Sequence, residues 1–390
     1  MKSLCVHIGS KRVTPHDPIR DYYCRVYGKT PGYLYPSPDF FEIPTWIPAL
    51  MGRMSEAEAK GVAFQCLGSV SALAEHGSDV VVYGSVMDTT LPIWRKLADW
   101  YPTTTFGLGG YVDPEAFKNN PNVVWSASLD SISLVDRGPD YRLFRGWPCI
   151  PRLQLSSGCT HKCNFCMVPR VVTERPLADI VRDVDSFRGL AFELVYIDDK
   201  TFGQAKNWTL LAKLGLRIKL YNPDFDGFVV QTTATQVLRH AEDWAKNYWV
   251  RYIETGVETL DDTTLRLWRK PHTAAQCWEA ARLIRRLYDY NGYRVKWIPN
   301  LIFGIAGDER GPHDYIPTVD AVSEWRDWGI VPFVNPYILT QYADARGKVA
   351  RSYAGDKPGD SSENTVDKSW LDYRDREAAS EALETVLAMF

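Results

Sequence analysis

The amino-acid sequence predicts an α/β protein with a doubly wound domain, then a partial parallel barrel, then a helical tail. Two observations lead to this fold class. Short apolar runs typical of buried strands alternate with amphipathic, helix-like stretches along most of the chain. A linker containing Gly and Pro divides this alternation into two series. The length of 390 residues fits two or three domains, and 45% hydrophobic residues supply a sizeable core.

The first series, residues 1–135, holds the elements of the doubly wound domain. A short apolar run at Leu4–Ile8 predicts the first buried strand. A helix is predicted over Ser55–His76, because Ser55 and Glu58 form a capping pattern and Gly77 is a stop signal. Further strands are expected at Asp79–Tyr83, Thr103–Leu108 and Asn122–Ser126, and helices at Leu91–Trp100 and Pro114–Asn119. This alternation favours a parallel sheet.

The second series, residues 152–340, follows a linker at 136–151 and predicts a partial (β/α)6 barrel. Its strands are expected at Arg152–Leu155, Leu194–Ile197, Phe228–Thr232, Arg251–Thr255, Val295–Phe303 and Val331–Leu339. Its helices are expected at Pro176–Arg188, Thr235–Asn247, Thr273–Asp289 and Tyr315–Trp328. The active site of such a barrel lies at the carboxyl ends of the strands.

The C-terminal extension, residues 341–390, is expected to end in a helix. Residues 341–368 are rich in Gly, Ser and Asp and predict irregular structure. Tyr373–Leu387 places Ala379, Leu383 and Val386 on one side, so we expect this helix to pack against the barrel. A helix that binds a partner protein is the alternative.

Composition excludes several classes of protein. The net charge of −3 argues against binding a polyanion mainly through counterion release, so a nucleic-acid partner is not favoured. No apolar run approaches the length of a membrane span, and the first residues do not form a secretory signal. Eight cysteines in a chain of this length are too few for a disulfide scaffold, which favours a cytoplasmic location.

Three cysteines on one short loop are the most informative feature of the sequence. Cys159, Cys163 and Cys166 follow the first predicted barrel strand with the spacing C-x3-C-x2-C. Three thiolates can occupy three corners of a 4Fe–4S cluster and leave the fourth iron open to a small molecule. A structural zinc site is the alternative, but it requires a fourth ligand, and His161 is poorly placed within the loop.

This loop resembles the radical S-adenosylmethionine (SAM) superfamily, whose motif is C-x3-C-x-aromatic-C, with Phe165 in the aromatic position. The resemblance implies an enzyme whose 4Fe–4S cluster chelates SAM through its amino and carboxylate groups. One electron, supplied by a reducing partner such as flavodoxin or ferredoxin, then cleaves SAM to methionine and a 5′-deoxyadenosyl radical. The radical removes a hydrogen atom from a substrate.

Other strand ends carry similar family segments. Asp198 and Asp199 end the second barrel strand, and the resemblance implies a role near the SAM methionine or the substrate; capping the next helix is the alternative. Thr255 and Glu258 belong to a segment similar to the family's G-x-E-S, which implies that they hold polar groups of SAM.

The fifth barrel strand ends in Phe303–Glu309, which resembles the segment whose backbone approaches adenine in the family. Gly304 and Ile305 are the residues implied to make this contact. An ordinary strand-end turn would use glycine in the same way.

The first domain resembles the Rossmann-like, cobalamin-binding domains that precede many radical SAM barrels. Gly84, Ser85 and Met87 follow one strand, and Gly109 and Gly110 follow the next. Small residues at these strand ends imply room for the nucleotide tail of cobalamin. Turn glycines in an ordinary doubly wound domain are the alternative.

One departure from the cobalamin-binding pattern concerns the cobalt ligand. The motif D-x-H-x-x-G is absent, and the loop after the first strand reads Gly9–Val13 without a histidine. The sequence therefore implies that any cobalamin is bound without a histidine ligand from this loop.

The leading functional hypothesis is a cobalamin-dependent radical SAM methyltransferase that methylates an unactivated carbon. The first alternative is a methylthiotransferase-like enzyme acting on tRNA or a protein side chain, which needs a second cluster. Cys5, Cys24 and Cys66 are available for it but lack that family's local contexts. The second alternative is an iron–sulfur electron carrier. The substrate is not readable, and the high aromatic content of 13% allows a peptide, a natural product or a nucleobase.

Overall fold

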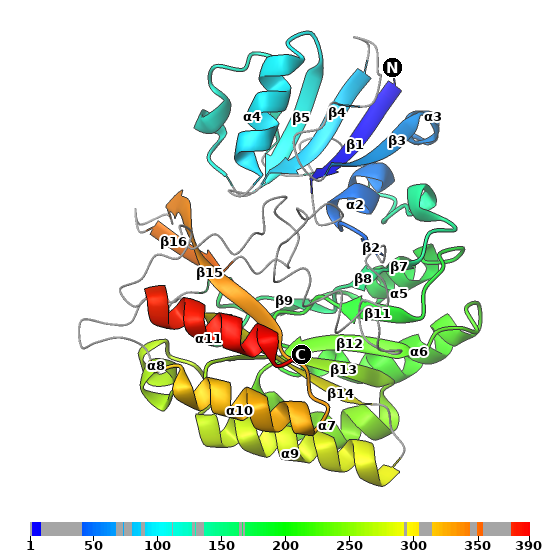
Figure 1. Cartoon of the computed structure of the whole chain (residues 1–390). Helices are drawn as coiled ribbons and strands as arrows, with labels where there is room; N and C mark the ends of the chain where they lie inside the picture. Colours follow the sequence, from blue (N-terminus) through cyan, green and yellow to red (C-terminus); the bar gives the residue numbers. More distant parts are fainter. Residues whose placement is uncertain are drawn as a thin grey trace.

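The structure is a computed structural model. It describes residues 2–8, 41–67, 73, 80–86, 90–110, 112–126, 129, 136–163, 166, 168–291, 295–303, 314–343, 349–353 and 376–390. Figure 1 shows an N-terminal sheet above a larger sheet whose helices line one side.

The N-terminal domain is a five-stranded parallel sheet with the order β3-β1-β4-β5-β6. The strands are β1 (Lys2–Ile8), β3 (Val62–Leu67), β4 (Val80–Val86), β5 (Thr105–Gly110) and β6 (Val123–Trp125). Counted along the sheet, this is the doubly wound order 2-1-3-4-5, so the predicted fold class is confirmed for this domain. Its topological switch point, where such sheets bind ligands, lies between β1 and β4.

The helix predicted over Ser55–His76 is wrong for residues 62–67, and most of residues 68–76 lie outside the described residues. Helix α3 covers only Glu56–Lys60, with the expected capping box between Ser55 and Glu58. Gly61 ends it, and Val62–Leu67 forms strand β3. Pairing with β1 outweighs helix propensity here, because the parallel neighbour satisfies the backbone hydrogen bonds of this run.

The second sheet has seven strands in the order β16-β15-β14-β13-β12-β11-β8. All pairs are parallel except β15 with β16 (Val349–Tyr353). The parallel strands are β8 (Arg152–Leu153), β11 (Leu194–Ile197), β12 (Gly227–Thr232), β13 (Val250–Glu258), β14 (Lys296–Phe303) and β15 (Phe333–Ala343). These six strands match the predicted partial barrel.

Helices cover the outer face of this sheet (Figure 1). The predicted ones are α5 (Leu177–Ser186), α7 (Ala234–Asn247), α9 (Ala274–Asn291) and α10 (Ile316–Asp327). The final helix, α11 (Arg376–Ala388), packs beside α10 and β14, so the expectation that it covers the barrel is confirmed. Strand β16, in contrast, lies where the sequence predicted irregular structure.

Several elements were not expected from the sequence. They are the helices α2 (Trp46–Arg53), α6 (Leu211–Lys219) and α8 (Asp262–Leu267), the 3-10 turns η4 (Arg142–Phe144) and η5 (Lys206–Leu210), and the two-residue strands β2 (Phe41–Glu42), β7 (Cys149–Ile150), β9 (Ser156–Ser157) and β10 (Thr173–Glu174). The predicted short helix near residue 114 is a 3-10 turn, η2 (Pro114–Phe117).

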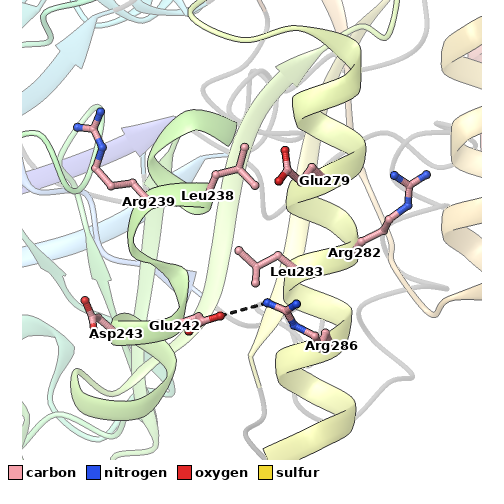
Figure 2. Close-up of a pocket in the computed structure, with 8 residues that line it drawn as sticks. All are labelled: Leu238, Arg239, Glu242, Asp243, Glu279, Arg282, Leu283 and Arg286. Atoms are coloured by element: carbon pink, nitrogen blue, oxygen red, sulfur yellow. Dashed lines mark hydrogen bonds and ion pairs between the residues drawn. The ribbon is translucent and has the colours of Figure 1, made fainter.

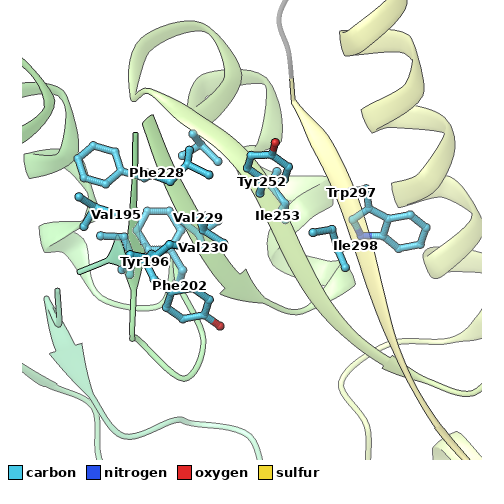
Figure 3. Packing of buried hydrophobic residues seen from close by; sticks show 14 of the residues in the cluster. Val195, Tyr196, Phe202, Phe228, Val229, Val230, Tyr252, Ile253, Trp297 and Ile298 are labelled. Atoms are coloured by element: carbon cyan, nitrogen blue, oxygen red, sulfur yellow. The ribbon is translucent and has the colours of Figure 1, made fainter. Parts of the chain in front are cut away.

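The two faces of the barrel sheet differ in chemistry. The register aligns Leu153, Ile197, Val230, Ile253 and Trp297 on one face, and Trp297 packs on Trp325 of α10. This is the outer, apolar face, and Figure 3 shows part of the core around these strands. Side chains alternate along a strand, so Arg152, Tyr196, Asp198 and Glu254 point to the inner face.

The core of the barrel continues toward the N-terminal domain. Cys5 of β1 and Val62 of β3 belong to the same buried cluster as the barrel strands. On the opposite side of the N-terminal sheet, Val82, Trp94 and Phe106 form a separate core beneath α4 (Leu91–Trp100). Among the described residues, no helix is long and apolar enough to cross a membrane.

Candidate functional site

The cysteine loop leaves the barrel at the carboxyl end of β8, as predicted. Cys159 and Cys163 are buried, and Cys166 is half-buried. Gly158 has a φ of +80°, and a Cβ there would lie 1.9 Å from the carbonyl oxygen of Val171, so this position requires glycine. The loop closes where the amide of Cys159 donates to the carbonyl of Pro169 at 2.9 Å.

A single guanidinium group holds this loop together. Arg170 donates to the carbonyl oxygens of His161, Cys163 and Cys166, the last two at 3.2 and 3.0 Å. Each carbonyl bonded in this way fixes the backbone beside a thiol. Arg170 is well suited to this role because its planar fork presents several donors in fixed directions.

The three thiols lie together on one loop, as the ligands of a cluster would. In the described part of the chain, no three His, Cys, Asp or Glu side chains converge closely enough to hold one ion. A cubane places each cysteine on a different iron, so its ligands surround a volume instead of converging on one point. Burial raises the pKa of the Cys163 thiol, and Lys270 opposes this rise. The thiols of Cys166 and Cys159 raise the pKa further, so the three sulfurs interact electrostatically.

Asp199 supports the strand that leads into the loop. Its buried carboxylate accepts hydrogen bonds from the amides of Leu155 and Ser156 at 2.8 and 2.9 Å and from the Ser156 hydroxyl at 2.5 Å. Burial raises the pKa of Asp199 and these hydrogen bonds oppose the rise. These contacts give Asp199 a structural role, and its predicted catalytic role stays a prediction.

Replacing Asp199 with Ala should lower the free energy of unfolding by roughly 3 kcal/mol, because three donors lose a charged acceptor. Asp198→Ala is the matched control. The Asp198 side chain is partly exposed and meets Arg152 at 3.5 Å and Lys200 at 3.4 Å, contacts whose loss should cost at most about 1 kcal/mol. Urea unfolding followed by tryptophan fluorescence measures both; equal losses would contradict the assigned role.

Thr255 lies on the outer side of the sheet, away from the cysteine loop, and its predicted contact with SAM stays a prediction. Its side chain is fully buried, and its Oγ1 accepts a hydrogen bond from Trp297 Nε1 at 2.7 Å. Trp297 lies on the outer face against Trp325, and Thr255 therefore belongs to the layer between sheet and helices. The sequence segment was recognised, but the alternation of side chains along β13 puts Thr255 on the other face.

Glu258 turns toward the cluster loop at a bulge. The register between β13 and β14 shifts between Gly256 and Glu258, and Glu258 has a φ of +67°. Its Oε1 lies 2.8 Å from Nζ of Lys270. Both side chains are buried, with 5% of Lys270 and 6% of Glu258 exposed. Burial opposes the charge of Lys270, but Glu258 and Cys163 hold its pKa above the ordinary value. Sequence reasoning missed Lys270, which no spacing pattern connects to the cysteines.

A second polar group lies on the inner face of the sheet. The hydroxyl of Tyr196 donates to Oε2 of Glu254 at 2.7 Å, and both residues are buried. Burial raises the pKa of Glu254 to about 7, against the opposing effects of Tyr196 and Arg152. The guanidinium of Arg152 lies 4.8 Å from the Tyr196 ring centroid. Glu254 was not identified from the sequence.

Packing accounts for the glycines of the N-terminal domain. A Cβ at Gly84 would lie 2.1 Å from the Trp94 ring, one at Gly109 would lie 2.7 Å from the Ser126 carbonyl oxygen, and one at Gly110 would lie 2.1 Å from that of Val86. These positions are small because neighbouring groups approach closely. Ser85 is half-buried and pairs with Gly109 on the other face of β4 from Gly84. A cobalamin pocket at these residues stays a prediction.

Four predicted site residues, Phe165, Met87, Gly304 and Ile305, lie outside the described residues. A hollow of about 560 Å³ lies between α7 and α9 and is lined in part by Leu238 and Leu283. Figure 2 shows Arg286 reaching toward Glu242, whose Oε1 lies 3.1 Å from Nη2 of Arg286. This hollow lies on the outer helices and contains none of the predicted site residues.

Comparison with known families agrees with the geometry of the cysteine loop. Residues 153–304 match the family model of the radical SAM superfamily. This part of the chain is thus similar to radical SAM domains, and the likeness supports an enzyme over an electron carrier. In this family the domain carries a 4Fe–4S cluster and binds SAM.

Curated relatives match over a short part of the chain. The ribosomal protein uS12 methylthiotransferases RimO of Janthinobacterium sp. (strain Marseille) and Herminiimonas arsenicoxydans are both 30% identical over 105 residues. The match covers 25% of this chain and 21% of each relative, so it spans about a fifth of their length.

Solved structures share the fold over most of the chain. The cobalamin-dependent SAM radical enzyme OxsB superimposes with a TM-score of 0.52 at 12% identity, covering 83% of this chain and 52% of OxsB. The radical SAM methyltransferase TsrM from Kitasatospora setae gives 0.52 at 12% identity, covering 87% of this chain and 76% of TsrM. The likeness confirms the expected α/β architecture of doubly wound domain and radical SAM barrel.

Proposed function

We propose that the protein is a cobalamin-dependent radical SAM methyltransferase. The observation that carries the proposal is the arrangement of a 2-1-3-4-5 sheet before a six-stranded barrel with the cysteine loop at its first strand. OxsB and TsrM share this arrangement, and both were solved with cobalamin bound. Cobalamin binding and methyl transfer by this chain are part of the proposal.

The chain's own residues have clear roles in this proposal. Cys159, Cys163 and Cys166 hold the cluster, and Arg170 keeps their loop in shape. When bound, the cluster and SAM supply the radical, and cobalamin supplies a methyl carrier. Lys270 and Glu258 offer one positive and one negative charge beside Cys163, complementary to the carboxylate and ammonium groups of SAM.

The inner face of the barrel is the proposed place for the substrate. Glu254, Tyr196 and Arg152 provide acceptors and donors there, so a substrate with polar groups fits this face better than a purely apolar one. TsrM was solved with tryptophan as its substrate. For this chain, a peptide, a natural product and a nucleobase all remain candidate substrates.

Anaerobic reconstitution with iron, sulfide and hydroxocobalamin, followed by gel filtration, tests the function. We expect about four irons and one corrin for each chain, and formation of 5′-deoxyadenosine from SAM after reduction. Protein that emerges with its iron and without corrin absorbance would contradict cobalamin dependence.

A methylthiotransferase is the second candidate, favoured by the RimO matches. That chemistry needs a second cluster in the N-terminal domain. Cys5 is fully buried within the core, and burial raises the pKa of its thiol to about 12, which disfavours it as a ligand. Cys24 lies outside the described residues. About eight irons without corrin in the same reconstitution would favour this candidate.

A further inference from the structure

We propose that Gln204 is a positioning residue that raises the reduction potential of the cluster through a hydrogen bond to the sulfur of Cys159. The inference rests on the proposed cluster and goes beyond it by assigning a residue outside the cysteine motif. Gln204 lies in the turn between β11 and η5, far along the chain from the loop that it contacts.

Two hydrogen bonds fix the orientation of the Gln204 amide. Its Oε1 accepts from the backbone amide of Thr160 at 2.9 Å, and its Nε2 donates to Sγ of Cys159 at 3.5 Å. A backbone amide can only donate, so it must face the carbonyl oxygen of the side chain. The NH2 group is thereby directed at the sulfur, and the opposite rotamer would place two donors against each other.

Among the described side chains near this sulfur, Gln204 is the donor with the least competition from other acceptors. The amide of His161 also points at Cys159 Sγ, at 3.4 Å. Thr201 Oγ1 lies 3.3 Å from Sγ, but this hydroxyl has one proton and already donates to the carbonyl of Lys200 at 2.8 Å. Within the part of the chain that the structure describes, Gln204 has no such competing acceptor for the proton directed at Cys159.

The effect of such a bond on the cluster has a definite sign. Reduction adds negative charge to the iron and sulfur atoms, and an N–H donor at a ligand sulfur stabilises that charge. Cys159 is only 8% exposed, so water competes little with the donor. Gln204 therefore makes the cluster easier to reduce, which SAM cleavage requires.

The test uses reconstituted protein and two substitutions. Gln204→Met removes both hydrogen bonds, whereas Gln204→Glu keeps the acceptor for Thr160 and replaces the donor with a carboxylate oxygen. Reduction potentials are measured by potentiometry with electron paramagnetic resonance detection, with iron content determined on the same samples. We expect both variants to shift to more negative potential than the parent protein.

Gln276→Met is the matched control, because Gln276 caps the start of α9 through the Thr273 amide and has no contact with the cluster loop in the described residues. It should keep the parent potential. An unchanged potential in Gln204→Met with full iron would overturn the inference, because only this variant removes the donor without adding a charge. If Gln204→Met loses iron, an unchanged potential in Gln204→Glu would overturn it instead. A parent protein that binds no cluster would instead contradict the proposed function.

Discussion

A Cys163→Ala variant should lose the iron–sulfur cluster and all reductive cleavage of SAM. Cys163 is buried at the centre of the loop that Arg170 braces, so no other thiol can take its place without a rearrangement of that loop. Two remaining cysteines leave a cubane with only two protein ligands. We expect iron content after reconstitution to fall to background, measured together with the visible spectrum and the yield of 5′-deoxyadenosine.

Cys277→Ala is the control for this experiment. Cys277 is fully buried on α9, and burial raises the pKa of its thiol to about 12, so it behaves as a small hydrophobic side chain. The variant should keep its iron and lose at most about 1 kcal/mol of stability. Full iron and full SAM cleavage in Cys163→Ala would contradict the assigned site.

A Ser85→Trp variant should lose cobalamin but retain iron and SAM cleavage. Ser85 is half-buried near the carboxyl end of β4, beside the topological switch point. An indole there would fill space that the proposed cobalamin tail needs, without touching the cysteine loop. The ratio of corrin absorbance to iron after gel filtration measures the effect, and circular dichroism checks that the domain is folded.

Ser85 is a better probe than Gly109 because any side chain at Gly109 would meet the backbone of Ser126 and disturb the sheet itself. Lys96→Trp adds the same bulk at an exposed position of α4 and should bind as much cobalamin as the parent protein. Equal corrin content in Ser85→Trp and Lys96→Trp would place the ligand elsewhere.

Local patterns predicted most of the fold, and tertiary contacts explain the exceptions. The helix stripe at α9 and the apolar runs at β11 and β12 specify their own secondary structure, so their positions are confirmed. Helix α6 was missed because Gly215 interrupts it; a Cβ there would lie 3.0 Å from the Trp249 ring. Strand β3 was missed because its partner β1 lies far away in the sequence.

The candidate site shows the same difference between residues set by a local pattern and residues set by tertiary contacts. The cysteines were identified because their ligand pattern is local, within one loop. Arg170, Gln204 and Lys270 were not identified, because their roles depend on which carbonyl, sulfur or carboxylate the folded chain brings to them. Thr255 shows the converse case, since the segment that resembles the family carries no information about which face of the sheet its side chain meets.

The contacts of Arg170 bear on how the enzyme is matured in the cell. Its bonds to three carbonyls close the cysteine loop using protein atoms alone. Small zinc domains, by contrast, obtain much of their folding energy from the metal. Because these bonds need only protein atoms, we expect the loop to keep its shape before the cluster is inserted. Oxidative damage to the cluster should then leave an intact apoprotein that can be repaired by reloading, without new synthesis of the chain.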